Sequence, residues 1–183
     1  MRNIPVILLG LLLVQCGGPE ARKPIEVKTG SFIKQSVERN RELLASEEEL
    51  IGSIIATDST QDYISTDFGA WYFYQEEKLS SDYLPQENDL VNMTYDILSL
   101  QNDTIYSKDE IGVLEYLVDR EELFPGLRMG VKLLRKGETV TFLFPSHLAF
   151  GYHGDNNRIG PNIPVKSTVT IIGIEQSKDS IPN

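Results

Sequence analysis

The sequence offers few side chains that could act as nucleophiles or metal ligands. It contains two histidines and a single cysteine, which is too few for a zinc-type cluster or an intramolecular disulfide. Ser146 stands next to His147, but neighbouring residues of a strand, as expected here, point to opposite faces and cannot act together as nucleophile and base. Any chemistry must therefore come from other residues, and no metal or cofactor is expected.

Alternating and aromatic segments fill the second half of the chain. Apolar and polar residues alternate from 91 to 97, as in a half-buried strand. The pair Asn102–Asp103 then predicts a hairpin turn. A short helix is expected from Pro125 into residues 128–134. Further strands are expected over residues 69–75, 113–118, 139–144 and 168–175.

Four sequence blocks follow this hairpin. They read LFPGLRMGV at 123–131, LRKGE at 134–138, PSHLAFG at 145–151 and IPVKSTV at 163–169. In residue type, order and spacing, the chain from about 66 to 176 resembles the FKBP-type peptidyl-prolyl cis-trans isomerases. The resemblance implies an α+β fold, an FKBP-like bent antiparallel β-sheet wrapped over one short helix, with an N-terminal helical extension here. It also implies an active site in the apolar cleft between sheet and helix.

A cleft of this kind needs no nucleophile. The peptide bond before proline has little preference between cis and trans, yet it interconverts over tens of seconds or more, because twisting breaks the amide resonance. The planar amide is the more polar state, so a dry aromatic cleft favours the twisted state. The resemblance thus implies isomerase activity on proline-containing protein clients, without a cofactor.

The residues that match the family's motifs make up the predicted site. The resemblance implies catalytic roles for Tyr95, Tyr106, Leu123, Phe124, Leu127 and Phe150. It implies substrate contacts for Leu114, Ser107, Ile163 and Ile171. The backbone N–H of Phe124 would hold a substrate carbonyl.

Four departures from the family pattern affect this site. Leu127 replaces the usual tryptophan, Phe150 replaces a tyrosine whose hydroxyl would bond the substrate, and Ser107 replaces an aspartate. The hairpin is also one residue longer. A lost hydrogen bond typically costs about 1 kcal/mol, so we expect modest activity and weak macrolide binding. A non-catalytic FKBP-like binding module in an envelope assembly is the alternative.

The N-terminus has the pattern of an export signal. Arg2 is followed by an apolar run from Ile4 to Val14 and then by Cys16. The run is shorter than the ~20 residues of a spanning helix and has the proportions of a signal-peptide core. It resembles the bacterial lipoprotein signal, in which the cysteine is diacylated, the preceding residues are removed and the new amine is acylated. We therefore expect a signal over 1–15 and a lipid-anchored tether over 16–30, with an ordinary secretory signal as the alternative.

Residues 31–65 are expected to form a helical extension before a domain at 66–183. A stripe of apolar residues runs along the helix at helical spacing: Ile33, Val37, Leu44, Ile51 and Ile55. Charged residues at 47–49 interrupt the stripe. The interruption favours a helix packed on its own domain over an arm for homodimerisation or for holding clients.

The charge of the chain limits its partners. A formal net charge of −10 argues against nucleic acid as a partner, because phosphate binding needs a basic surface. Together with the lipoprotein signal, the family resemblance implies a folding helper for exported or envelope proteins, anchored to a membrane and facing the periplasm. Within the family, the short lipid-anchored N-terminus and the divergent hairpin most resemble the lipoproteins associated with gliding motility.

Overall fold

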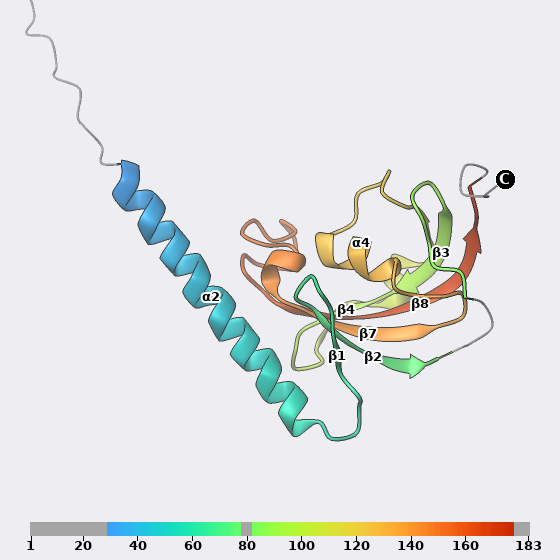
Figure 1. The fold of residues 1–183 in the computed structure, drawn as a ribbon, viewed down its shortest axis with the longest axis horizontal. Helices are drawn as coiled ribbons and strands as arrows, with labels where there is room; N and C mark the ends of the chain where they lie inside the picture. Colours follow the sequence, from blue (N-terminus) through green and yellow to red (C-terminus); the bar gives the residue numbers. More distant parts are fainter. Residues whose placement is uncertain (1–28, 78–81, 178–183) are drawn as a thin grey trace, which may run out of the picture. The chain divides into compact units, whose positions relative to one another are not determined.

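The computed structural model describes residues 29–77 and 82–177 (Figure 1). The predicted signal segment and Cys16 lie outside these residues. Of the helices in this part of the chain, none is both long and apolar enough to cross a membrane. The chain divides inside helix α2 (Thr29–Thr57), with residues up to Val37 in one unit and residues from Glu38 onward in another. The sheet and the candidate site belong to the second unit.

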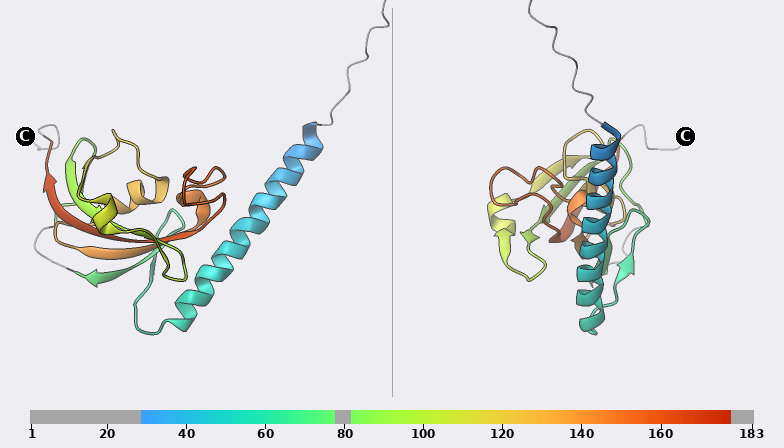
Figure 2. Two further views of the ribbon diagram at one scale, coloured as in Figure 1. Left: turned by 180° about the vertical axis from the view of Figure 1, so that it is seen from behind. Right: turned by 90° about the vertical axis from the view of Figure 1, so that its left-hand side faces the viewer.

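One antiparallel sheet forms the body of the second unit. Its pairings are antiparallel throughout, and β4 (Ile97–Leu98) and β5 (Thr104–Tyr106) form the predicted hairpin, with β4 also pairing with β8. The sheet curves beneath the short helix α4 (Pro125–Val131) (Figures 1 and 2), which confirms the expected fold class. In spatial order the remaining strands are β1 (Ile64–Ser65), β2 (Trp71–Glu76), β7 (Thr139–Phe144), β8 (Val165–Glu175), β3 (Leu90–Tyr95) and β6 (Leu114–Leu117).

Two glycines let α4 approach the sheet closely. A Cβ atom on Gly126 would lie 2.5 Å from Cδ1 of Phe144, and one on Gly130 would lie 2.9 Å from Cζ of Phe142. Both rings are fully buried and stack with centroids 5.2 Å apart. The glycines of the LFPGLRMGV block therefore face the sheet, where any larger residue would push the helix away.

The LRKGE block forms a tight turn between α4 and β7. Gly137 has a φ of 89°, a conformation that glycine adopts without strain. The buried carboxylate of Glu138 accepts a hydrogen bond of 2.7 Å from the backbone N–H of Arg135. The Gly137 N–H donates to the Ile171 carbonyl at 2.7 Å, which fixes the turn to β8.

The C-terminal part of α2 packs on the sheet. Ile51 is fully buried in a small cluster with Leu100 and Leu143, and Trp71 packs against it. Earlier in the helix, Ile33 and Val37 expose 60% and 61% of their surface. The expected N-terminal helix is thus confirmed, and its buried contacts lie in its last turns.

Some predicted boundaries differ from the structure. Helix α4 ends at Val131 rather than Leu134, because the N–H groups of Leu133 and Leu134 donate to carbonyls three residues back and tighten the chain into turns. Ser146 and His147 lie in a 3₁₀ turn, η2 (Ser146–Leu148), and not in a strand. Ser146 is buried there and His147 is exposed.

Candidate active site

A cleft of about 400 Å³ lies where β3, the segment before α4 and the segment after η2 meet. Tyr95 comes from the end of β3, Leu123 and Phe124 precede α4, and Phe150 follows η2. Ala149 and Glu122 complete the lining. Four residues predicted to be catalytic therefore line one cavity, although Tyr95 and Phe150 are far apart in the sequence.

The aromatic rings of the cleft are held by the core beneath them. The Phe124 ring meets buried Phe144 edge-on, with centroids 5.4 Å apart and planes at 82°. It lies against Phe150 at 5.2 Å and 40°. Because Phe144 is itself stacked on Phe142, the position of Phe124 is fixed by packing rather than by polar contacts.

Phe124 also presents a backbone donor to the cleft. It precedes Pro125, the first residue of α4, and has an extended conformation with φ −61° and ψ 147°. Its carbonyl accepts the N–H of Arg128 at 3.1 Å, whereas its own N–H bonds no residue that the structure describes. A free N–H at the start of a helix is suited to hold a substrate carbonyl.

Tyr95 adds a side-chain hydroxyl to the cleft wall. Burial raises the pKa of the Tyr95 phenol above its ordinary value, so the hydroxyl stays protonated at neutral pH. A protonated hydroxyl can donate a hydrogen bond to a ligand. The cleft thus combines apolar walls with a side-chain donor and a backbone donor.

Comparison with known proteins places this arrangement in a family. The model of the FKBP-type peptidyl-prolyl cis-trans isomerases matches residues 81–172, half of the chain. The chain belongs to the FKBP-type peptidyl-prolyl cis-trans isomerase family. The described cleft residues all lie within the matched FKBP segment, which connects the family to the geometry.

Individual proteins are similar to this chain in sequence or in fold. A probable FKBP-type peptidyl-prolyl cis-trans isomerase FkpA from Neisseria meningitidis is 29% identical over 90 residues, which cover 49% of this chain and 33% of that protein. The match therefore spans about a third of the relative's length. The crystal structure of FkpA from Escherichia coli has a TM-score of 0.58 at 19% identity, covering 96% of this chain and 83% of that one. The N-terminal domain of FKBP42 from Arabidopsis thaliana has a TM-score of 0.57 at 18% identity, covering 65% and 96%.

A polar network connects Tyr106 of the FKBP domain to the loop after η2, residues 151–164, which we call the flap. The Tyr106 hydroxyl donates to the Asp155 carboxylate, and the Asn157 amide donates to Tyr106 at 3.0 Å. The Arg158 guanidinium lies 4.7 Å from the centre of the Tyr106 ring and pairs with Glu110 of helix α3 (Lys108–Ile111). Tyr106 therefore anchors the flap, and its hydroxyl is already engaged.

These contacts shift the ionisation of the flap network. The hydrogen bond to Asp155 raises the pKa of Tyr106. Burial raises the pKa of Asp155, but hydrogen bonds from the Tyr106 hydroxyl and from backbone N–H groups of the flap outweigh it and lower the pKa overall. The Asp155 carboxylate is thus held ionised in its role as an acceptor.

The other predicted residues of the FKBP site are not among those that line the cleft. Leu127 and Ile171 are fully buried in the core. Leu114 packs partly buried against the same core, and Ile163 is 40% exposed in the flap. The Ser107 hydroxyl accepts the N–H of Glu110 at 3.2 Å as the N-cap of α3, which uses its acceptor locally.

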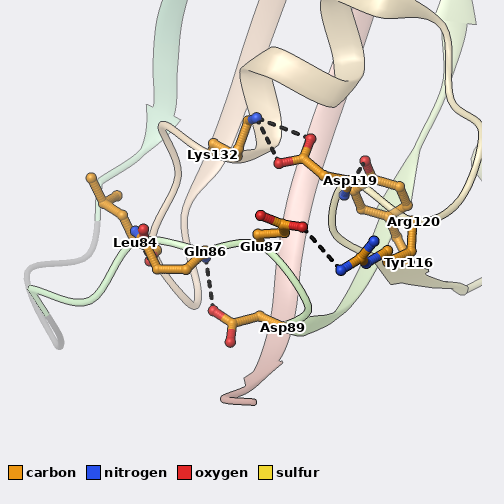
Figure 3. Close-up of polar contacts among 8 residues, drawn as sticks. All are labelled: Leu84, Gln86, Glu87, Asp89, Tyr116, Asp119, Arg120 and Lys132. Atoms are coloured by element: carbon orange, nitrogen blue, oxygen red, sulfur yellow. Dashed lines mark hydrogen bonds and ion pairs between the residues drawn. The ribbon is translucent and has the colours of Figure 1, made fainter. Parts of the chain in front are cut away.

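An ion pair supports the segment that delivers Leu123 and Phe124. Lys132, just after α4, contacts both carboxylate oxygens of Asp119 at 3.0 Å (Figure 3). Beside it, Arg120 pairs with Glu87 at 3.1 Å, and buried Asp89 accepts the Gln86 N–H at 2.8 Å (Figure 3). The contacts of Asp119 and Arg120 hold the start of the loop from β6 to α4.

The polar partners of the cleft and flap could not be predicted from the sequence. Asp155, Asn157 and Arg158 lie in a Gly- and Asn-rich loop without periodicity, so no spacing signal connected them to Tyr106. Glu122 lines the cleft, but in the sequence nothing distinguishes it from other charged loop residues. Within the described ranges, no cluster of three potential metal-ligating side chains is found.

Proposed function

We propose that this chain catalyses cis–trans isomerisation of peptide bonds before proline. The observation that carries the proposal is the meeting of Tyr95, Phe124 and Phe150 in one cleft with the free N–H of Phe124. The family membership supports the same reaction.

The cleft suits the physical demands of this reaction. The proline ring would enter among the apolar rings, and the Phe124 N–H would donate a hydrogen bond to the substrate carbonyl that follows. Apolar walls solvate the planar amide poorly, while the twisted amide, which has lost resonance, is less penalised. The barrier falls because the cleft binds the twisted state better than either planar state.

A protease-coupled assay on short peptides with an apolar residue before proline tests the proposal. We expect acceleration by the wild-type chain and its loss in Phe124→Asp. The matched control is Phe68→Asp, which changes another partly buried phenylalanine that packs on the same core. Phe68 lines a different hollow, which shares no residue with the cleft. If a folded wild-type chain gives no acceleration across several pre-proline residues, the enzyme proposal fails.

A second candidate function, a non-catalytic binding module, is favoured by one observation. The Tyr106 hydroxyl is engaged by Asp155, and Phe150 has no hydroxyl, so fewer polar groups remain to orient a twisted amide. In cells, Tyr95→Ala combined with Phe124→Asp separates the two functions. If the cellular function survives in the folded but catalytically inactive variant, the binding-module function is supported and catalysis is not needed.

We further propose that Cys16 is lipidated and anchors the chain to a membrane facing the periplasm. The signal-like residues 1–15 and the position of the cysteine support this proposal. Metabolic labelling with a radioactive fatty acid should mark the wild-type chain and not Cys16→Ser. Equal labelling of both, or of neither, would contradict lipidation at this residue.

The cellular role proposed here is assistance to exported or envelope proteins that contain proline, including components of gliding motility. The resemblance of the N-terminus and hairpin to the gliding-associated lipoproteins supports the narrower part. Normal surface spreading by a deletion strain would contradict the role in gliding motility.

We also propose that exposed Ile33 and Val37 allow homodimerisation through α2. An unchanged particle mass after Val37→Lys would contradict this.

A further inference from the structure

A second hollow, of about 250 Å³, lies between α2 and the residues that follow β7. We call it the α2 groove. Its walls come from two stretches of the second unit. The residues that matter are Leu43, Leu44 and Glu47 on the helix, and Ser146, Gly151 and Tyr152 on the facing segment.

Glu47 is the unusual residue of the groove. It is only 5% exposed, although the residues on either side of it in the helix are exposed. One carboxylate oxygen, Oε2, accepts the Ser146 N–H at 2.8 Å. The other, Oε1, is buried and has no hydrogen-bond partner among the residues described.

An unpaired buried carboxylate oxygen is costly, because burial removes water without supplying another donor. No described lysine or arginine pairs with Glu47, and the histidine in the lining, His147, is exposed and leaves Oε1 unpaired. A cationic donor brought by a ligand would fill the vacant acceptor.

Most of the remaining groove surface is apolar, although Asn40 and Asn162 also line it. Leu44 is 36% exposed and Tyr152 is 75% exposed, while Leu43 is half-buried. A fitting ligand therefore combines an apolar stem with a cationic, hydrogen-bonding head. Lysine and arginine side chains have this construction, and the net charge of −10 attracts them over longer distances.

We propose that the α2 groove binds a basic side chain of a polypeptide client, with its cationic head on Glu47 and its stem against the two leucines. The groove adjoins the cleft through one short segment. Ala149 and Phe150 line the cleft, and Ser146, Gly151 and Tyr152 line the groove. The identity of the client rests on the proposed function, since one extended polypeptide would occupy both hollows.

The test uses the full chain and a probe without proline, so that the cleft chemistry plays no part. The probe is the acetylated, amidated pentapeptide Ala-Leu-Arg-Leu-Ala, and its control carries citrulline, a neutral isostere, in place of arginine. Binding is measured by calorimetry, and the amides of Ser146 and Gly151 are followed by NMR. We expect the arginine peptide to shift both amides and to bind about tenfold or more tightly than the citrulline peptide.

Variants assign the binding to the groove. Glu47→Gln keeps an oxygen to accept the Ser146 N–H but removes the charge, and should weaken arginine-peptide binding about tenfold. Glu48→Gln, the same change at the exposed neighbour, should leave it unchanged. Tyr152→Ala tests the apolar wall at an exposed position where folding is not at stake, and should also weaken binding.

Isomerase activity measured on a separate proline peptide distinguishes the two proposals. Arginine-peptide binding in a chain without isomerase activity would support the groove and remove the enzyme proposal. Normal turnover with equal binding of arginine and citrulline peptides would overturn the groove. Wild-type affinity in Glu47→Gln, or the absence of any shift at Ser146 and Gly151, would overturn it as well.

Discussion

The close approach of α4 to the sheet predicts a sharp cost for one methyl group at Gly126. In Gly126→Ala, the new Cβ would lie 2.5 Å and 2.7 Å from two carbons of the Phe144 ring, and 2.9 Å from the Leu148 carbonyl oxygen. The ring cannot swing aside, because it is fully buried, stacked on Phe142 and in contact with the edge of Phe124.

The magnitude follows from two opposing effects. Overpacking of a tight core typically costs about 1–3 kcal/mol. Alanine is favoured over glycine by up to about 1 kcal/mol in a helix interior, and by less in the first turn, where Gly126 lies. We therefore expect the free energy of unfolding to fall by about 1–2 kcal/mol. Gly52→Ala in α2 is the matched control, because nothing lies within 4 Å of its Cβ. The free energy of unfolding of Gly52→Ala should rise by about 0.5–1 kcal/mol.

Urea unfolding followed by fluorescence measures both variants. The chain has one tryptophan, Trp71, which packs where α2 meets the sheet, so a single probe reports on the folded unit. If the free energy of unfolding of Gly126→Ala lies within about 0.5 kcal/mol of the wild-type value, the close packing of α4 on Phe144 does not limit this position. A Gly52→Ala variant destabilised to the same extent as Gly126→Ala would also contradict the reasoning from close packing.

Three further predictions concern the cleft and the flap. Phe150→Tyr restores a hydroxyl beside the substrate and should raise kcat/KM about fivefold; an unchanged value would mean that this position does not touch the substrate. Arg158→Met removes the pair with Glu110 and should increase hydrogen exchange in the flap with little change in global stability, because the pair is exposed; unchanged exchange would show that the network does not anchor the flap. The lowered pKa of Asp155 means that its stabilising contribution is present above the ordinary carboxyl pKa and is lost as pH falls toward the lowered folded value. Flap protection in the wild type should therefore decline on acidification from about pH 6 to about pH 3, whereas Asp155→Asn should show lower and flatter protection; identical profiles would contradict the assignment.

The elements with strong local patterns could be predicted from the sequence. The strand over 139–144 has the bounds predicted for it, and the hairpin turn at Asn102 has the positive φ, 73°, typical of such a residue in a turn. Tyr95, Leu123, Phe124 and Phe150 could be grouped because each belongs to a family motif, and the fold brings them to one cleft.

Contacts between segments far apart in the sequence could not be predicted. Glu47 and Ser146 are 99 residues apart, and the charged residues at 47–49 looked like a break in the apolar stripe. In the structure Glu47 lies on the buried side of α2, where the Ser146 N–H donates a hydrogen bond to its carboxylate. The flap anchors on Tyr106 were missed for the same reason, since hydrogen bonds between loops leave no periodic trace in a sequence.

The most direct test of the central claim is exchange spectroscopy by NMR on a peptide containing a leucine–proline bond, with a small amount of the chain added. We predict exchange peaks between the cis and trans forms, a shift of the Phe124 amide on binding, and the disappearance of the exchange peaks with Phe124→Asp but not with Phe68→Asp. A folded chain that shifts no cleft amide and produces no exchange peaks would contradict the claim.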